Sequence, residues 1–132
     1  MDIVIDTSAI IAVILGEPER DELVRMTDGE QLIAPPSLHW EIGNALTAMF
    51  RRGRITLDQA THTLALYQQI TIRLAEIDLG RAVELAHQYN TYAYDAYMLA
   101  CALRYSRPLL SLDVRLHTAA RAAGITVMEV ER

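Results

Sequence analysis

Short runs of strongly β-forming residues alternate along this chain with longer segments of helical character. The β-forming runs are Ile3 to Ile5, Leu32 to Ala34, Ile72 to Ala75, Pro108 to Leu112 and Ile125 to Val130. Alternating strands and helices predict a three-layer α/β/α fold with a central, mainly parallel sheet and right-handed crossovers. A chain of 132 residues fits one domain, residues 1–132, with an autonomous core.

Residues with capping chemistry mark the expected helix ends. Ser8 is expected to cap a helix from Ala9 to Leu15, which Gly16 ends, and Pro18 suits the first turn of the next helix. One later helix is expected over 93–105. The others are expected to begin at the capping residues Ser37, Thr56, Asp78 and Asp113. Thr56 forms a capping box with Gln59, and its helix is expected to run to about Ile70.

Four acidic residues follow apolar runs where a strand ends or a helix starts: Asp6, Glu41, Asp95 and Asp113. In open α/β sheets, ligands bind outside the carboxyl ends of the strands, so we expect the four to meet at that edge. Each close pair would repel by about 4 kcal/mol at ~4 Å and an effective dielectric near 20. A divalent cation resolves this repulsion. Ordinary capping or solvation is a common alternative for Asp6 and Asp113 taken singly, whereas Glu41 and Asp95 lie among apolar residues, where an unpaired charge would be costly. Oxygen ligands favour Mg²⁺ or Mn²⁺.

Such a site predicts hydrolysis of a phosphodiester by a metal-activated water, without a protein nucleophile. Ser8 and Ser111 have no histidine near them in sequence, so we expect them to hydrogen-bond the carboxylates or metal waters, with helix capping as the alternative. Zinc is disfavoured because the histidines are dispersed and are expected to be surface or packing residues: His39, His62, His87 and His117.

The charged residues narrow the function classes. The formal charge is −5, which argues against a surface that attracts nucleic acid everywhere. All 12 basic residues are arginine, which excludes a P-loop and argues against aspartate-based phosphatases and receiver domains, because both use a lysine. The single Cys101 is expected to pack in the core. The stretch Ala9 to Leu15 is too short to cross a bilayer, so we expect no signal peptide, no membrane span and a cytoplasmic location.

Four segments in order resemble the PIN-domain ribonucleases, and among them the VapC toxins of bacterial toxin–antitoxin pairs. They are 3–9 (IVIDTSA), 40–46 (WEIGNAL), 94–100 (YDAYMLA) and 110–113 (LSLD). The resemblance implies a PIN-like fold in which one or two Mg²⁺ or Mn²⁺ ions are held by four catalytic residues, Asp6, Glu41, Asp95 and Asp113. Ser8 and Ser111 would support the site, with Asn44 nearby.

The resemblance also implies endonucleolytic cleavage of RNA to a 5′-phosphate and a 3′-hydroxyl, and a small VapB-like antitoxin as partner. The last motif departs from the family pattern, since Ser111 replaces threonine and Leu116 stands where an aromatic residue is usual. Serine keeps the hydroxyl, but the packing that orients Asp113 could differ. The alternative is a catalytically silent PIN-like binding module that acts through an antitoxin or nucleic acid.

Three groups of residues suggest contact surfaces. Arg51, Arg52 and Arg54 could bind RNA phosphates or simply complement a helix C-terminus. The tyrosines at 89, 92, 94 and 97 could stack on bases, although a homodimer contact is favoured. An antitoxin groove could include Trp40, Met49, Phe50 and Tyr67, with core packing as the favoured interpretation for these residues.

Overall fold

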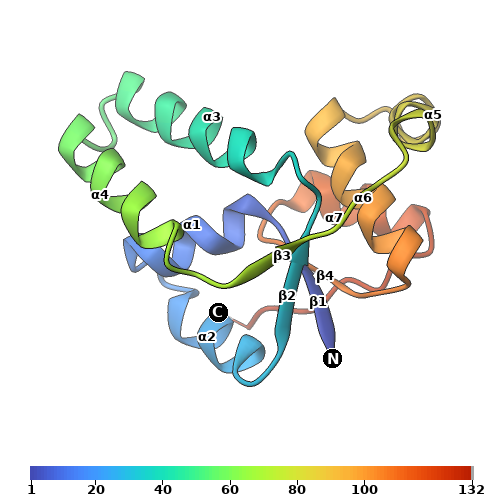
Figure 1. Cartoon of the computed structure of the whole chain (residues 1–132), viewed down its shortest axis with the longest axis horizontal. Helices are drawn as coiled ribbons and strands as arrows, with labels where there is room; N and C mark the ends of the chain where they lie inside the picture. The colour runs from blue at the N-terminus through green and yellow to red at the C-terminus, as the bar shows by residue number, and fades with distance from the viewer. Residues whose placement is uncertain (132) are drawn as a thin grey trace.

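The computed structural model describes residues 1–131 and has a four-stranded parallel sheet at its centre. The strands are β1 (Asp2–Ile5), β2 (Gln31–Ala34), β3 (Ile72–Leu74) and β4 (Leu109–Leu110), in the order β3-β2-β1-β4. Val4 pairs with Ile33 of β2 on one side and with Leu109 of β4 on the other. This parallel sheet confirms the expected topology (Figure 1).

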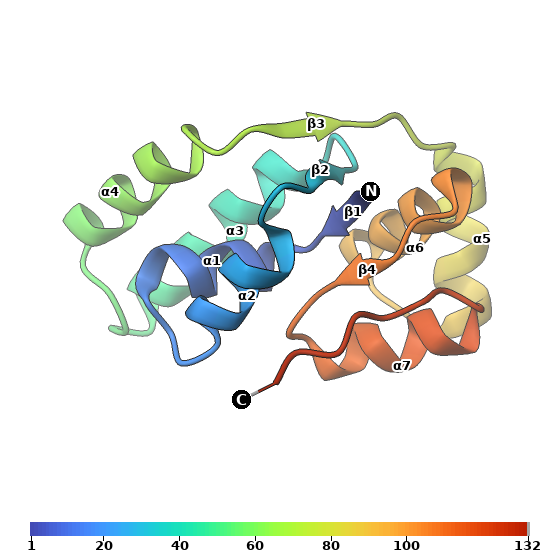
Figure 2. The same ribbon diagram turned by 90° about the horizontal axis from the view of Figure 1, so that it is seen from below.

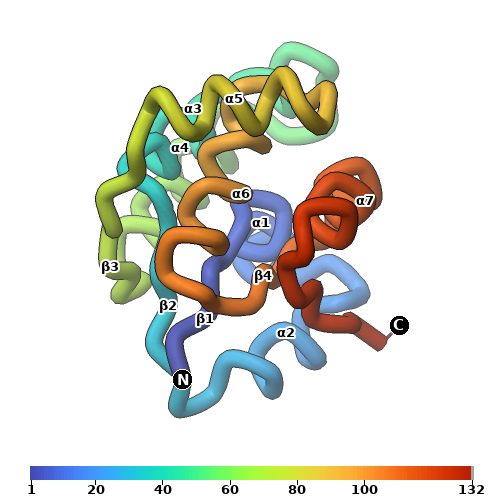
Figure 3. Tube along the Cα trace, turned by 90° about the vertical axis from the view of Figure 1, so that its right-hand side faces the viewer, coloured from blue at the N-terminus to red at the C-terminus, as the bar shows by residue number. Residues whose placement is uncertain are grey.

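Helices lie on both sides of the sheet, which confirms the three-layer prediction (Figure 2). Helices α1 to α4 lie to one side and α5 to α7 to the other, and Figure 3 looks onto the side with α6. Their bounds are α1 (Thr7–Leu15), α2 (Arg20–Thr27), α3 (Leu38–Arg51), α4 (Leu57–Tyr67), α5 (Leu79–Tyr89), α6 (Ala93–Tyr105) and α7 (Val114–Ala122).

The core forms where β1 is enclosed by neighbouring strands and by helices on both faces. Ile3, Val4 and Ile5 are all at most 5% exposed, as expected for a parallel strand buried on both sides. From α6, the residues 98–102 are all buried. Cys101 is fully buried, as predicted, and burial raises the pKa of its thiol to about 12. None of the helices in residues 1–131 combines the length and apolar character needed to cross a membrane.

Two expected strands are shorter in the structure. The Pro108 to Leu112 segment supplies only the two residues of β4. The Ile125 to Val130 segment forms only an isolated parallel bridge, in which the N–H of Leu109 donates to Thr126 and the N–H of Met128 donates to Leu109. The carbonyl of Pro108 faces β1 and accepts from the N–H of Val4, but proline has no N–H, so Pro108 cannot donate to β1 in return and extend the β1–β4 pairing.

Some of the capping predictions are confirmed and others are wrong. The Thr56–Gln59 capping box is present, Asp78 caps α5 and Gly16 ends α1 in the left-handed conformation. The prediction for Ser8 is wrong, because α1 begins at Thr7 with Asp6 at its N-cap. Ser37 occupies the N-cap position of α3, as predicted, but its side chain makes no cap hydrogen bond. Helix α2 begins two residues after Pro18, and α4 ends at Tyr67, before Ile70.

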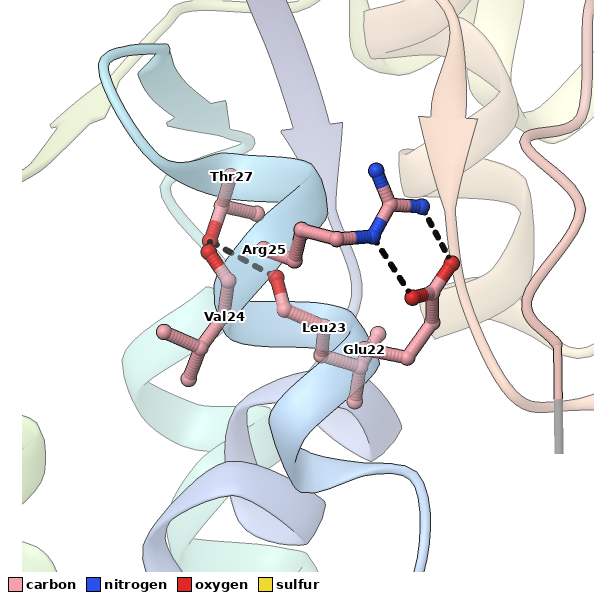
Figure 4. A network of polar contacts seen from close by, with 5 residues as sticks. All are labelled: Glu22, Leu23, Val24, Arg25 and Thr27. Atoms are coloured by element: carbon pink, nitrogen blue, oxygen red, sulfur yellow. Dashed lines mark hydrogen bonds and ion pairs between the residues drawn. The ribbon is translucent and has the colours of Figure 1, made fainter.

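Helix α2 is attached to the core mainly through Leu23, its one buried residue. Its solvent side is stabilised locally: Arg25 donates from Nε and Nη2 to the two oxygens of Glu22, at 2.8 and 2.6 Å (Figure 4). The hydroxyl of Thr27 donates to the carbonyl of Leu23 one turn earlier. An exposed pair of this kind contributes about 0 to 1 kcal/mol, so burial of Leu23 is the main attachment.

The residues of the proposed antitoxin groove have different environments. Trp40 is 71% exposed, so the favoured interpretation of core packing is wrong for it. It lies on the solvent side of α3, whereas its neighbours Leu38 and Ile42 face the core. Tyr67 is buried, and its hydroxyl pairs with His39 Nδ1 at 2.7 Å. Met49 and Phe50 are half-buried against the core.

Candidate active site

The centre of the candidate site is Asp6, where β1 passes into α1. Its N–H donates to the carbonyl of Leu110, which continues the β1–β4 ladder by one step, and only 4% of the residue is exposed. Ser8 Oγ and Ser111 Oγ each donate to Asp6 Oδ2 at 2.8 Å. Two hydroxyl donors on one oxygen hold the carboxylate in a single orientation and compensate part of its burial.

The two serines also fix the β4–α7 loop. Ser8 Oγ accepts from the N–H of Leu112 at 2.9 Å, and Ser111 Oγ accepts from the N–H of Asp113 at 3.0 Å. Each hydroxyl therefore uses its one hydrogen on Asp6 and a lone pair on the loop backbone. Of the alternatives for Ser8, the structure shows hydrogen bonding to a carboxylate instead of helix capping.

The other three acids enter the site from three separate helix starts. Glu41 lies in the first turn of α3, Asp95 in the first turn of α6, and Asp113 is the N-cap of α7. All four acids line one cleft of about 590 Å³. Asp113 also caps α7 in the ordinary way, because its Oδ1 accepts from the N–H of Arg115 at 2.9 Å. Capping and a place in the cleft are therefore compatible for this residue.

The electrostatics show that the acids are close enough to repel one another. Burial, then the charge and hydrogen bonding of Asp6, raise the pKa of Glu41 from 4.5 to about 9. Burial, then the charges of Asp113 and Asp6, raise the pKa of Asp95 from 3.8 to about 6. Carboxyl groups perturbed by burial and like charges inside a cleft are typical of functional sites.

The donor set fits a hard divalent cation in its chemistry. It consists of carboxylate oxygens, and Glu41 Oε2 is buried without a hydrogen-bond partner. As the side chains lie, residues 1–131 contain no group of three or more histidine, cysteine, aspartate or glutamate residues arranged to hold a metal ion. Binding an ion here therefore requires Glu41 to lose its proton and the side chains to adjust.

The cleft also contains residues around the four acids, some of them expected. Asn44 and Arg54 line it, whereas Arg51 and Arg52 are exposed and are not part of its lining. Glu17 and Arg115 line it and were missed by the sequence interpretation. Arg115 has a signal that could have identified it, because it lies two positions after Asp113 in the first turn of the same helix.

The histidines have the surface or packing environments that the sequence predicted. His62 and His87 are exposed. His117 Nε2 hydrogen-bonds to the backbone carbonyl of Ser111, so this histidine supports the loop that carries Asp113. The site is thus built from oxygen donors, with imidazole outside the cleft.

Comparison with known proteins identifies the family. The model of the PIN domain matches residues 3–122, so the chain belongs to the PIN domain family. The matched range contains the four acids that the sequence predicted for the site. Most PIN domains are nucleases, and this membership is consistent with an acidic site at the sheet edge. No curated protein matches the chain.

Solved structures show the same fold at low sequence identity. PAE2754 from Pyrobaculum aerophilum matches with a TM-score of 0.70 and 20% identity, over 96% of this chain and 83% of that one. VapC20 of Mycobacterium tuberculosis, a sarcin-ricin loop cleaving toxin, matches with a TM-score of 0.66 and 15% identity. The match covers 96% of this chain and 98% of VapC20. VapBC2 from Rickettsia felis, bound to a DNA fragment from its promoter, matches with a TM-score of 0.68 and 10% identity. The match covers 99% of this chain and 100% of the matched chain.

Proposed function

We propose that this protein is a Mg²⁺-dependent endoribonuclease and the toxin of a VapBC-type toxin–antitoxin pair. The observation that carries the proposal is the meeting of Asp6, Glu41, Asp95 and Asp113 in one cleft, with the pKa of Glu41 raised to about 9 and that of Asp95 to about 6. Membership of the PIN family and the similarity to a toxin that cleaves RNA support the choice of reaction.

The four acids would hold the ion, with Mn²⁺ as a substitute for Mg²⁺. When bound, the ion would supply an activated water and neutralise the charge that develops during in-line attack on a phosphodiester. Asp6 would contact the ion through Oδ1, because Oδ2 accepts from both serines. Glu41 is protonated near neutral pH in the metal-free protein, so ion binding is coupled to release of its proton.

The remaining residues of the cleft would bind and orient the RNA. Asn44 has an amide that can donate to a phosphate or ribose oxygen, and Arg54 brings a cation to the α3 side of the cleft. The net charge of −5 makes such local cations necessary, because the carboxylates repel the RNA backbone. The products would carry a 5′-phosphate and a 3′-hydroxyl.

The proposal includes a small antitoxin as partner. The VapBC2 structure contains such a pair, and this cleft places the apolar side chains of Ile11, Ala45 and Met49 beside its acidic centre. An amphipathic helix could bury apolar residues against this strip while a basic side chain reaches the carboxylates. We also propose a homodimer and a cytoplasmic site of action, where RNA and antitoxin are available.

The test is cleavage of total bacterial RNA by antitoxin-free protein with Mg²⁺ or Mn²⁺, compared with EDTA, and with product ends mapped. Asp95→Asn is expected to abolish cleavage and leave the circular dichroism spectrum unchanged. Asp58→Asn is the matched control, because Asp58 is an exposed acid in the first turn of α4 and lies outside the cleft. This variant should cleave RNA like the wild type.

Each result has a clear meaning. Discrete cuts that require the metal and disappear in Asp95→Asn would establish the nuclease and name its substrate. Absence of both cleavage and divalent-ion binding by calorimetry would overturn the enzyme and favour the silent binding module. Equal cleavage by Asp95→Asn and the wild type would remove the acidic cleft as the active site.

A further inference from the structure

Tyr92 and Arg115 form a stacked pair beside the acidic centre of the cleft. The guanidinium carbon of Arg115 lies 5.2 Å from the centre of the Tyr92 ring. Both side chains line the cleft together with Asp95 and Asp113. Tyr92 is the N-cap residue of α6 and Arg115 is in the first turn of α7, so the pair connects the two helix starts that carry these acids.

The pair is open to solvent and is not part of the core. Tyr92 is 69% exposed even though Arg115 lies over one face of its ring, so the other face is accessible. Arg115 is also exposed. A rigid aromatic ring with an accessible face, beside a cation, has the two features by which proteins hold unpaired nucleotides: a stacking surface for the base and a donor for the phosphate.

Arg115 is placed to offset the repulsion between the acids and a phosphate. Burial and the charges of Asp113 and Asp6 raise the pKa of Asp95, and the charge of Arg115 opposes that rise, which shows its proximity to the acidic centre. Arg54 lines the same cleft and follows α3 in the chain. Helix α3 lies on the opposite side of the sheet from α7 (Figures 1 and 2). A strand bound along the cleft would therefore meet a cation on each side of the acids.

We propose that Tyr92 and Arg115 form a nucleotide subsite for single-stranded RNA, in which the ring stacks on one unpaired base and the guanidinium binds an adjacent phosphate. This inference rests on the proposed ribonuclease function and adds the state of the substrate it selects. Bases inside a duplex have no free face, so the subsite selects loops or single strands. For Tyr92, this role replaces the homodimer contact expected from the sequence, because its ring lines the cleft.

The test measures binding without cleavage. Metal-free protein in EDTA is titrated into a fluorescein-labelled single-stranded oligoribonucleotide and, separately, into the same sequence as a duplex. Tyr92→Ala is expected to weaken binding to the single strand about fivefold to tenfold, Tyr92→Phe less than twofold, and neither to change binding to the duplex. Arg115→Gln is expected to weaken binding and reduce the slope of log affinity against log salt by about one.

Two matched variants control for general effects. Trp40→Ala removes an aromatic residue that is equally exposed but lies outside the cleft, and Arg121→Gln removes an arginine from α7 that pairs with Glu129 at 2.6 Å. Both are expected to bind RNA like the wild type. A second readout reports stacking directly: fluorescence of a single 2-aminopurine, moved along the oligonucleotide, should be quenched at one position by the wild type and by Tyr92→Phe but not by Tyr92→Ala.

The outcomes separate this inference from the proposed function. Wild-type protein that binds and cleaves RNA, with unchanged affinity and quenching in Tyr92→Ala, would overturn the subsite and leave the nuclease standing. Wild-type protein that neither binds nor cleaves any RNA would overturn both. If Tyr92→Ala fails to fold, Tyr92→Leu decides, because it keeps an apolar side chain without a flat face; affinity equal to the wild type would then contradict the proposal.

Discussion

Ser111 Oγ donates to Asp6 Oδ2 at 2.8 Å although the two residues are 105 positions apart in the chain. The contact exists because β1 and β4 are neighbours and end at the same edge of the sheet. Ser8 supplies the second donor to the same oxygen. The orientation of the central carboxylate therefore depends on two segments that only the fold brings together.

We predict that Ser111→Ala destabilises the protein by about 1 to 3 kcal/mol, because it removes a buried hydrogen bond to a charged group and the acceptor of the Asp113 N–H. Divalent-ion affinity should fall about tenfold to a hundredfold. Urea unfolding and calorimetry measure the two effects. Ser37→Ala is the matched control: Ser37 Oγ is buried without a partner, so its loss should change stability by less than about 0.5 kcal/mol. Equal losses in both variants would argue against the role of Ser111.

We predict that metal-free protein loses stability as pH rises from about 4.5 toward 9. The folded protein keeps the Glu41 proton through this range, whereas the unfolded chain releases it near the ordinary pKa of 4.5, so folding binds a proton and is favoured by acid. Each pKa unit corresponds to about 1.4 kcal/mol, and relaxation around the charged group should reduce the total to about 2 to 4 kcal/mol.

Glu41→Gln should remove this pH dependence and be more stable than the wild type at pH ~8.5 in EDTA. The raised pKa of Asp95 adds a smaller loss of stability between its ordinary pKa of 3.8 and about 6. This smaller loss should persist in Glu41→Gln. Urea midpoints across this pH range measure both. Parallel curves for the two proteins above pH ~6 would contradict a raised pKa for Glu41.

We predict that Mg²⁺ or Mn²⁺ stabilises the wild type, and more at pH ~8 than at pH ~6, because the ion competes with the proton on Glu41. An ion present at a hundred times its dissociation constant would raise the free energy of unfolding by about 2.7 kcal/mol. Thermal unfolding with and without the ion measures the shift, and chelation should reverse it. Asp6→Asn should abolish the shift, whereas a shift equal to that of the wild type would place the ion elsewhere.

We predict contrasting effects for two neighbours at the start of α3. Leu38 is fully buried, so Leu38→Ala should cost about 2 to 5 kcal/mol of unfolding free energy. Trp40 is 71% exposed, so Trp40→Ala should change it by less than about 0.5 kcal/mol. Denaturant unfolding compares the two. A large loss for Trp40→Ala would mean that its ring is buried in solution, for example in the proposed homodimer.

The sequence determined the order of elements and the identity of four of the acids in the cleft, but not Glu17. Local chemistry is sufficient for this: β-forming runs define strands, the Thr56–Gln59 pair defines a helix start, and an acid within an apolar helix, such as Asp95, needs a compensating partner. Local signals also explain the errors. Ser8 has the side chain of a helix cap, yet its hydroxyl binds Asp6 and Leu112 instead, because β4 arrives beside it.

Tertiary structure alone decided the surroundings of the acids. Two arginines line the cleft, Arg54 and Arg115, whereas Arg51 and Arg52 do not. This selection depends on how the helices are placed around the sheet. The exposure of Trp40 and the burial of Tyr67 depend on which face of each helix meets the core. The raised pKa values of Glu41 and Asp95 follow from burial and from charges contributed by distant segments. Periodicity and capping act over a few residues, whereas these properties arise from contacts that the chain makes only when it is folded.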